Sequence, residues 1–165
     1  MSGFARTIQR NERLEDPLGR YIDMIAAAAD QMTELLETLA LAGRVEGGRF
    51  DPPLVEVDTL EVARAAAEKV DGVRADGEGA VVESDREVVT RSLAAFALCA
   101  RRHGRVPEVT LSVSGRTIQI APIGDAGKVI VGEDLKDLGA AVATRAIGAL
   151  GGSATVEGDA LRVLL

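Results

Sequence analysis

The sequence predicts an α+β protein in which a long helical arm precedes a two-layer α/β sandwich. Three observations carry this prediction. An apolar stripe with helical spacing runs from residue 17 to about residue 46, a Gly-Gly pair and a Pro-Pro pair interrupt the chain at residues 47–53, and strand and helix patterns then alternate to residue 165. We therefore expect two domains, a dimerisation arm at residues 1–50 and a sandwich at residues 51–165.

The arm carries an apolar seam whose members recur at alternating spacings of three and four residues. The seam consists of Leu18, Tyr21, Ile25, Ala28, Met32, Leu35, Leu39 and Ala42. Asp16-Pro17 predicts the start of the helix and Gly47-Gly48 its end. A helix from residue 17 to residue 46 would be roughly 45 Å long. A single arm of that length has too little of its own chain to pack against, so self-association is the simplest way to cover the seam.

The predicted dimer interface consists of the larger seam residues. They are Leu18, Tyr21, Ile25, Met32, Leu35 and Leu39.

The remaining elements follow from period-two and period-3.6 patterns bounded by glycines and capping residues. We expect a short strand at 54–57, then a helix that begins with a capping box at Asp58 and ends at about 70. Two strands at 73–75 and 80–83 should flank a glycine turn, and a second capping box at Ser84 should begin a helix that ends at about 103. A hairpin of 109–113 and 117–121, a helix at 135–150 and a last hairpin of 154–156 and 161–164 complete the predicted sandwich.

Composition and charge exclude several classes of function. Hydrophobic residues make up 47% of the chain, enough for a core, although only 2% are aromatic. The formal net charge is -7, so the basic surface that nucleic acid binding needs is missing. Since no apolar run reaches the ~20 residues that span a bilayer, we expect no membrane insertion and a cytoplasmic location.

Candidate catalytic and metal residues are few. His103 is the single histidine, at the end of a predicted helix, and Cys99 is the single cysteine. Because a structural zinc site needs about four soft or imidazole ligands, we expect no metal, and no motif implies a cofactor. The stretch Gly124-Asp125-Ala126-Gly127 could cradle a phosphate, but it lacks the Walker and dinucleotide spacings and is interpreted as a turn.

Three ordered segments resemble the C-terminal region of two-component sensor histidine kinases. Residues 21–50, ending ETLALAGRVEGGRF, are similar to the second dimerisation helix, which often ends DLLDLSRLEAGRL. Residues 84–104 resemble the asparagine helix of the ATP site, written LLNLLDNAxKHS in the family. Residues 138–152, LGAAVATRAIGALGG, are similar to GLGLALVRRLVEALGG. The resemblance implies that the sandwich is of the histidine-kinase-like ATPase (Bergerat) type.

The asparagine helix departs from the family pattern at the residues that hold magnesium. The magnesium-coordinating asparagine aligns with Cys99 and the earlier asparagine with Ala95, while the lysine that often follows aligns with Arg102. A thiol is a poor ligand for Mg²⁺, which prefers oxygen.

The adenine motif and the glycine motif are also altered. Pro122 stands about where the adenine-binding aspartate is expected, although Asp125 could be a displaced substitute. About ten residues separate Gly127 from Leu138, too few for the flexible ATP lid that the resemblance implies. Of the last glycine motif only Gly139 clearly survives.

The resemblance, with these losses, implies a non-catalytic signalling module rather than a working kinase. The phosphoacceptor histidine of the family lies on a first hairpin helix, and no histidine precedes residue 103. We expect a homodimeric pseudo-kinase scaffold or adaptor whose partner is a response-regulator receiver domain or a sensor kinase. Two alternatives stay open, a divergent ATP-binding ATPase and a histidine phosphotransferase, with Arg102, Asp125 and Gly139 lining any residual nucleotide site.

Overall fold

A computed structural model of the chain describes residues 18–165. It divides into two compact units, one ending at Ala40 and one running from Leu41 to Leu165. The predicted helix start at Asp16-Pro17 and the side chain of Leu18 lie outside the described residues.

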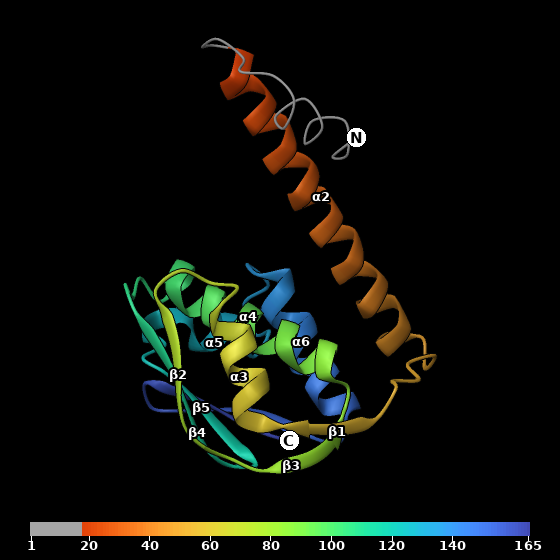
Figure 1. Ribbon diagram of the computed structural model, residues 1–165, viewed down its shortest axis with the longest axis vertical. Helices are drawn as coiled ribbons and strands as arrows, with labels where there is room; N and C mark the ends of the chain where they lie inside the picture. The colour runs from red at the N-terminus through yellow and green to blue at the C-terminus, as the bar shows by residue number, and fades with distance from the viewer. Residues whose placement is uncertain (1–17) are drawn as a thin grey trace. The chain divides into compact units, whose positions relative to one another are not determined.

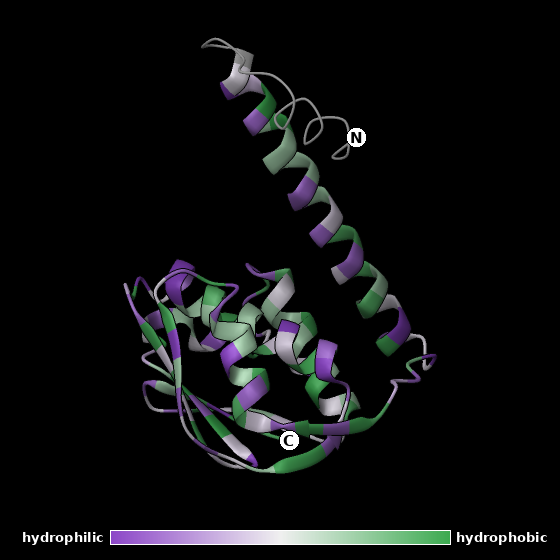
Figure 2. Ribbon diagram, in the orientation of Figure 1, coloured by the Kyte–Doolittle hydropathy of each residue, from purple (hydrophilic) through white to green (hydrophobic). Residues whose placement is uncertain are grey.

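The helix α2 spans Leu18–Glu46, as the apolar seam predicts. It ends where two consecutive glycines follow, with the Gly47 amide donating to the Gly43 carbonyl and the Arg49 amide to the Arg44 carbonyl. Gly48 has a φ of 61°, a backbone conformation that glycine adopts without strain. Figure 2 shows hydrophobic and hydrophilic residues alternating along the whole length of α2.

The second unit contains a five-stranded mixed sheet with the strand order β2-β4-β5-β7-β6. Its strands are β2 (Val73–Gly79), β4 (Val109–Gly115), β5 (Thr117–Ala121), β6 (Ser153–Glu157) and β7 (Ala160–Leu164). β2 pairs parallel with β4, and the other neighbours are antiparallel. A separate antiparallel pair is formed by β1 (Val55–Asp58) and β3 (Val81–Ser84).

Helices cover one face of the sheet and make the second layer (Figure 1). They are α3 (Thr59–Ala67), α4 (Arg86–His103), α5 (Gly127–Ile130) and α6 (Leu138–Ala149), with the short 3₁₀ helix η1 (Gly124–Ala126) before α5. An aspartate caps each of the three longer helices: the side chains of Asp58, Asp85 and Asp137 accept hydrogen bonds from first-turn amides.

The core lies between the sheet and the helices. Along β4 and β5 every second residue is buried, and those side chains meet the apolar face of α4, where Leu93, Phe96 and Cys99 are fully buried. The predicted α+β class, with a long helix followed by an α/β sandwich, is confirmed.

A second apolar cluster joins the end of α2 to the sandwich. Leu41 packs with Val88, Val142 and Ala146, and Phe50 lies against the same cluster. The compact units therefore divide between residues 40 and 41, ten residues before the predicted boundary, because the last turns of α2 contribute to the sandwich core.

The structure differs from the sequence prediction in three local features. β2 and β3 do not pair around their glycine turn, because β2 pairs with β4 and β3 with β1. The cap of α4 is Asp85, while Ser84 ends β3. The last helix begins at Leu138 rather than 135. The predicted turn at Gly124–Gly127 takes the form of the 3₁₀ turn η1, followed directly by α5. Among the described helices, none has the length and apolarity to cross a membrane.

Candidate functional site

The sequence-predicted nucleotide-site positions gather where the C-terminal half of α4 meets the N-terminus of α6. The backbone at Gly139 lies against the Ala95 methyl group: a Cβ built on Gly139 would be 3.7 Å from the Cβ of Ala95 and 3.3 Å from Oδ1 of Asp137. The first separation is ordinary van der Waals contact, and the second is tighter than most contacts of a real Cβ atom. The two helices thus touch at the positions that the resemblance assigns to the nucleotide.

Backbone also meets backbone where α4 ends. A Cβ on Gly104 would lie 2.1 Å from the Ile123 carbonyl oxygen, and one on Gly124 would lie 2.4 Å from the Gly104 carbonyl oxygen. Gly124 also has a φ of 52°. A residue with a Cβ could not approach so closely. Glycine at these two positions therefore lets the backbone of Ile123 and Gly124 contact the end of α4 directly.

The amides of the same turn are occupied by an internal carboxylate. Oδ1 of Asp159, in the β6–β7 turn, accepts the Gly124 amide at 2.7 Å and the Ile123 amide at 3.2 Å. A phosphate loop presents its amides to an anion. Here two of those amides already have one, which agrees with the interpretation of this stretch as a turn.

The segment after this turn is packed rather than loose. Ala126 and Ile130 are fully buried and belong to the main core. The Thr144 hydroxyl of α6 donates to the Ile130 carbonyl at 2.8 Å, which fixes the end of α5. A short packed helix therefore occupies the region where the resemblance implies an ATP lid.

Cys99 lies at the centre of this region, with no exposed surface. The pKa of the Cys99 thiol is raised to about 12, chiefly by burial and also by the negative charge of Asp137, while the positive charge of Arg102 lowers it. The thiol is therefore neutral at physiological pH. A neutral thiol offers nothing to Mg²⁺ and is not a nucleophile.

Two further residues complete a cluster around Cys99. His103 follows it by one turn of α4, and Asp137 reaches the pair from the N-cap of α6. The ligand atoms of the three side chains lie within 4.8 Å of one another. Nε2 of His103 is 3.4 Å from Oδ2 of Asp137. Sequence reasoning missed this cluster, although the spacing of Cys99 and His103 on a predicted helix was a visible signal.

The remaining predicted nucleotide-site residues are exposed. Arg102 points away from the buried face of α4, Pro122 follows the end of β5, and Asp125 lies on η1. They line the rim of the packed region.

The predicted dimer interface is uncovered in the single chain. Large parts of these side chains are exposed: Tyr21 58%, Ile25 51%, Met32 66%, Leu35 55% and Leu39 53%. Met24 and Leu36, at 62% and 67%, widen the same apolar surface.

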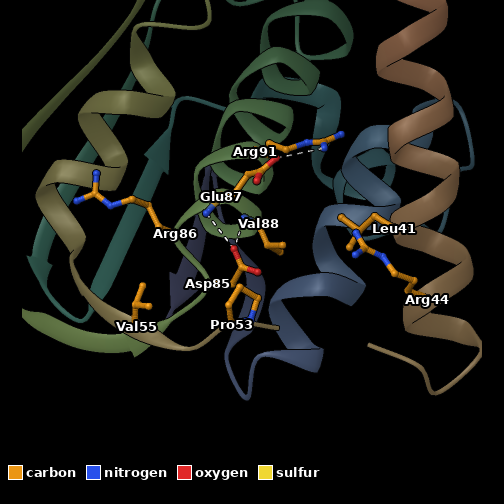
Figure 3. A pocket seen from close by; sticks show the side chains of 9 residues that line it. All are labelled: Leu41, Arg44, Pro53, Val55, Asp85, Arg86, Glu87, Val88 and Arg91. Carbon is orange, nitrogen blue, oxygen red and sulfur yellow. Dashed lines mark hydrogen bonds and ion pairs between the residues drawn. The ribbon is translucent and has the colours of Figure 1, made fainter. Parts of the chain in front are cut away.

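A groove of about 410 Å³ lies at the opposite end of α4 (Figure 3). It is lined by Leu41, Arg44, Pro53, Val55, Asp85, Arg86, Glu87, Val88 and Arg91. Its charges are largely engaged within the chain: Asp85 caps α4, Arg86 pairs with Glu61, and Arg91 lies 4.0 Å from Glu87. The groove therefore offers no concentrated charge for a ligand.

Comparison with known proteins identifies the fold. No protein-family model and no curated protein sequence matches the chain. Solved structures do. The Acinetobacter baumannii histidine kinase AdeS is 16% identical with a TM-score of 0.63, over 99% of this chain and 92% of that one. Full-length ShkA in complex with AMPPNP is 21% identical with a TM-score of 0.66, over 98% of this chain and 40% of that one.

A third structure covers the sandwich. The ATP binding domain of PrrB from Mycobacterium tuberculosis is 22% identical with a TM-score of 0.55, over 68% of this chain and 95% of that domain. At these identities the likeness shows the fold alone: a long helix followed by a two-layer α/β sandwich, the arrangement found in those histidine-kinase structures. The resemblance drawn from the three sequence segments is thereby confirmed at the level of fold.

Proposed function

We propose that this chain is a non-catalytic module of two-component signalling, a pseudo-histidine-kinase scaffold that acts as a homodimer. The observation that carries the proposal is the apolar surface of α2, on which Met32, Leu35 and Leu39 are each more than half exposed. Apolar seams at this spacing are covered by a second helix in stable proteins. A second copy of the chain presents the matching surface.

The packing of the nucleotide-site positions supports the absence of catalysis. Cys99 replaces a magnesium ligand with a neutral, fully buried thiol. The turn at Gly124 is closed onto α4, and its amide donates to Asp159. A nucleotide entering here would have to separate α4, η1 and α6, which share one core.

The partner class follows from the same arrangement. Response-regulator receiver domains bind the helical region of histidine kinases, so a receiver domain or a sensor kinase is the partner that this arm would serve. Titration of a labelled receiver domain with the chain should give saturable binding, and binding should be weakened by a charge placed on the apolar surface of α2.

Size-exclusion chromatography with light scattering tests the proposal. The chain at micromolar concentration should have twice its own mass of 17.2 kDa. A monomer that persists at this concentration would overturn the scaffold model, because a second copy of the chain would then not cover the apolar seam.

A second candidate is a divergent ATP-binding ATPase or phosphotransferase. Arg102 and Asp125 are exposed at the rim of the region, and the similar ShkA structure holds AMPPNP. Slow ATP hydrolysis that is lost in Asp125→Asn would favour the ATPase. Transfer of phosphate from a phosphorylated receiver domain to this chain would favour the phosphotransferase.

A further inference from the structure

The cluster of Cys99, His103 and Asp137 has the composition of a transition-metal site. Thiolate, imidazole and carboxylate are the ligands of Zn²⁺, and a thiolate favours zinc over magnesium or calcium. Cys99 and His103 are four residues apart on α4 and thus lie on one face of the helix, while Asp137 comes from the start of α6. The three ligands therefore come from two elements held by a common core.

The observed distances suit tetrahedral coordination. Zinc–nitrogen and zinc–oxygen bonds of about 2.0–2.2 Å at a tetrahedral angle place the two ligand atoms roughly 3.3–3.5 Å apart. Nε2 of His103 and Oδ2 of Asp137 are 3.4 Å apart. This is long for a hydrogen bond and right for two ligands of one ion. All three ligand atoms lie within 4.8 Å of one another, so the sulfur would move by no more than roughly 1 Å to take a tetrahedral position beside the other two ligands.

The surroundings orient the carboxylate. Oδ1 of Asp137 accepts the Ala140 amide at 3.0 Å as the cap of α6. The other oxygen, Oδ2, is the one turned toward His103. A hydrogen bond that fixes one oxygen of a ligating carboxylate is the usual support of a metal site. The side chains of His103 and Asp137 are 28% and 14% exposed, which leaves an entry path and room for a water as fourth ligand.

We propose that Cys99, His103 and Asp137 bind one Zn²⁺ ion, which fastens the end of α4 to the start of α6. On binding, the thiol gives up its proton to solvent and the thiolate sulfur forms the bond to zinc. The inference is independent of the proposed scaffold function, since zinc binding is measured separately from dimerisation and from nucleotide binding.

Cobalt is the probe for this site, because Co²⁺ replaces Zn²⁺ and is coloured. Titration of the full nucleotide-free chain with Co²⁺ should give one equivalent of binding, with a thiolate-to-cobalt charge-transfer band in the near ultraviolet. Zn²⁺ should bleach the band and raise the melting temperature. Absence of the band, or a band that requires more than one equivalent, would overturn the site.

Three variants test the ligands one by one. Cys99→Ala should abolish the band, and His103→Gln and Asp137→Asn should each weaken binding by more than the ~10–100-fold that a supporting residue costs. Asparagine still caps a helix, so Asp137→Asn removes the ligand with little loss of fold.

Asp76→Asn is the matched control, since it removes the same charge from an exposed position on β2, outside the cluster. Equal loss in this control, or an unchanged band in Cys99→Ala, would mean adventitious surface binding and would refute the proposal. His103 is partly exposed, so its glutamine variant supplies the test if Cys99→Ala does not fold.

Discussion

Two helices of this protein, α2 and α4, each carry an apolar stripe, and the two stripes differ in how far their side chains are buried. The apolar side chains of α4 are buried, with Leu93, Phe96 and Cys99 at zero exposure. Most large apolar side chains of α2 upstream of Leu41 are exposed, with Met32 at 66% and Leu36 at 67%, although the smaller Ala26 is buried. Among the described residues, α4 thus buries its apolar face in the sandwich core, whereas α2 exposes most of its large apolar side chains.

This difference in burial bears directly on the proposed function. The region that should hold a nucleotide is closed by packing between α4, η1 and α6. The surface that should hold a second copy is open. The proposed scaffold role rests on this contrast between an exposed apolar surface and a packed region.

The largest effect should come from placing a charge on the open surface. Leu35→Glu removes a side chain that is exposed in the single chain but buried in the proposed dimer. Burial of a leucine is worth about 1.5–3 kcal/mol, and a symmetric dimer contains two copies, so dimerisation should weaken by about 3–6 kcal/mol. Analytical ultracentrifugation should show a dissociation constant raised more than about a hundredfold.

Ala27→Glu is the control for this change. Ala27 is exposed on α2 and lies about 140° around the helix from Met32, on the side away from the seam. The same charge at this position should leave the dimer intact. If both variants dissociate equally, net charge rather than the apolar seam governs assembly.

A smaller loss should follow from opening the closed region. Gly104→Ala puts a methyl group where the Ile123 carbonyl oxygen lies. Overpacking of this kind costs about 1–3 kcal/mol, to be measured as the free energy of unfolding in urea. The matched control is Gly148→Ala on α6, where nothing lies within 4 Å of the added carbon, and which should stabilise the helix by up to about 1 kcal/mol. A neutral Gly104→Ala would mean that α4 and η1 are not in contact.

The third prediction concerns pH. The pKa of Cys99 is raised from 9.0 to about 12 in the folded chain, so the folded state holds the thiol proton more tightly than the unfolded state. The stabilisation is complete below pH 9 and is lost as the pH rises toward 12. Between pH 8 and pH 10.5 the wild type should lose about 2 kcal/mol more than Cys99→Ala, in metal-free buffer. Parallel losses in both proteins would place Cys99 in contact with solvent.

The elements that the sequence predicts well are those with a local signal. The seam runs along most of α2, a helix of 29 residues, and the β4–β5 and β6–β7 hairpins are joined by turns that contain glycine. The pairing of β2 with β4 could not be predicted in this way, because it joins strands separated by α4. α5 is four residues long, too short for a periodic pattern.

The site shows the same limit. The identities of Ala95, Cys99 and Pro122 are visible in the sequence, and from them the sequence predicts the loss of nucleotide ligands. The contacts that close the region are not visible, since Asp159 reaches Gly124 from a distant turn and Asp137 reaches His103 from the start of another helix. Two of the three residues of the Cys99, His103 and Asp137 cluster lie on α4, where helical spacing could have found them. The third, Asp137, required the fold.

The most direct test of the central claim is a thermal melt of the chain with and without millimolar Mg-ATP. A ligand at a hundred times its dissociation constant stabilises by about 2.7 kcal/mol, which is roughly 5–10 °C for a chain of this size. A function that resides on surfaces predicts the same melting temperature in both samples. A rise of several degrees that disappears when magnesium is withheld would contradict it.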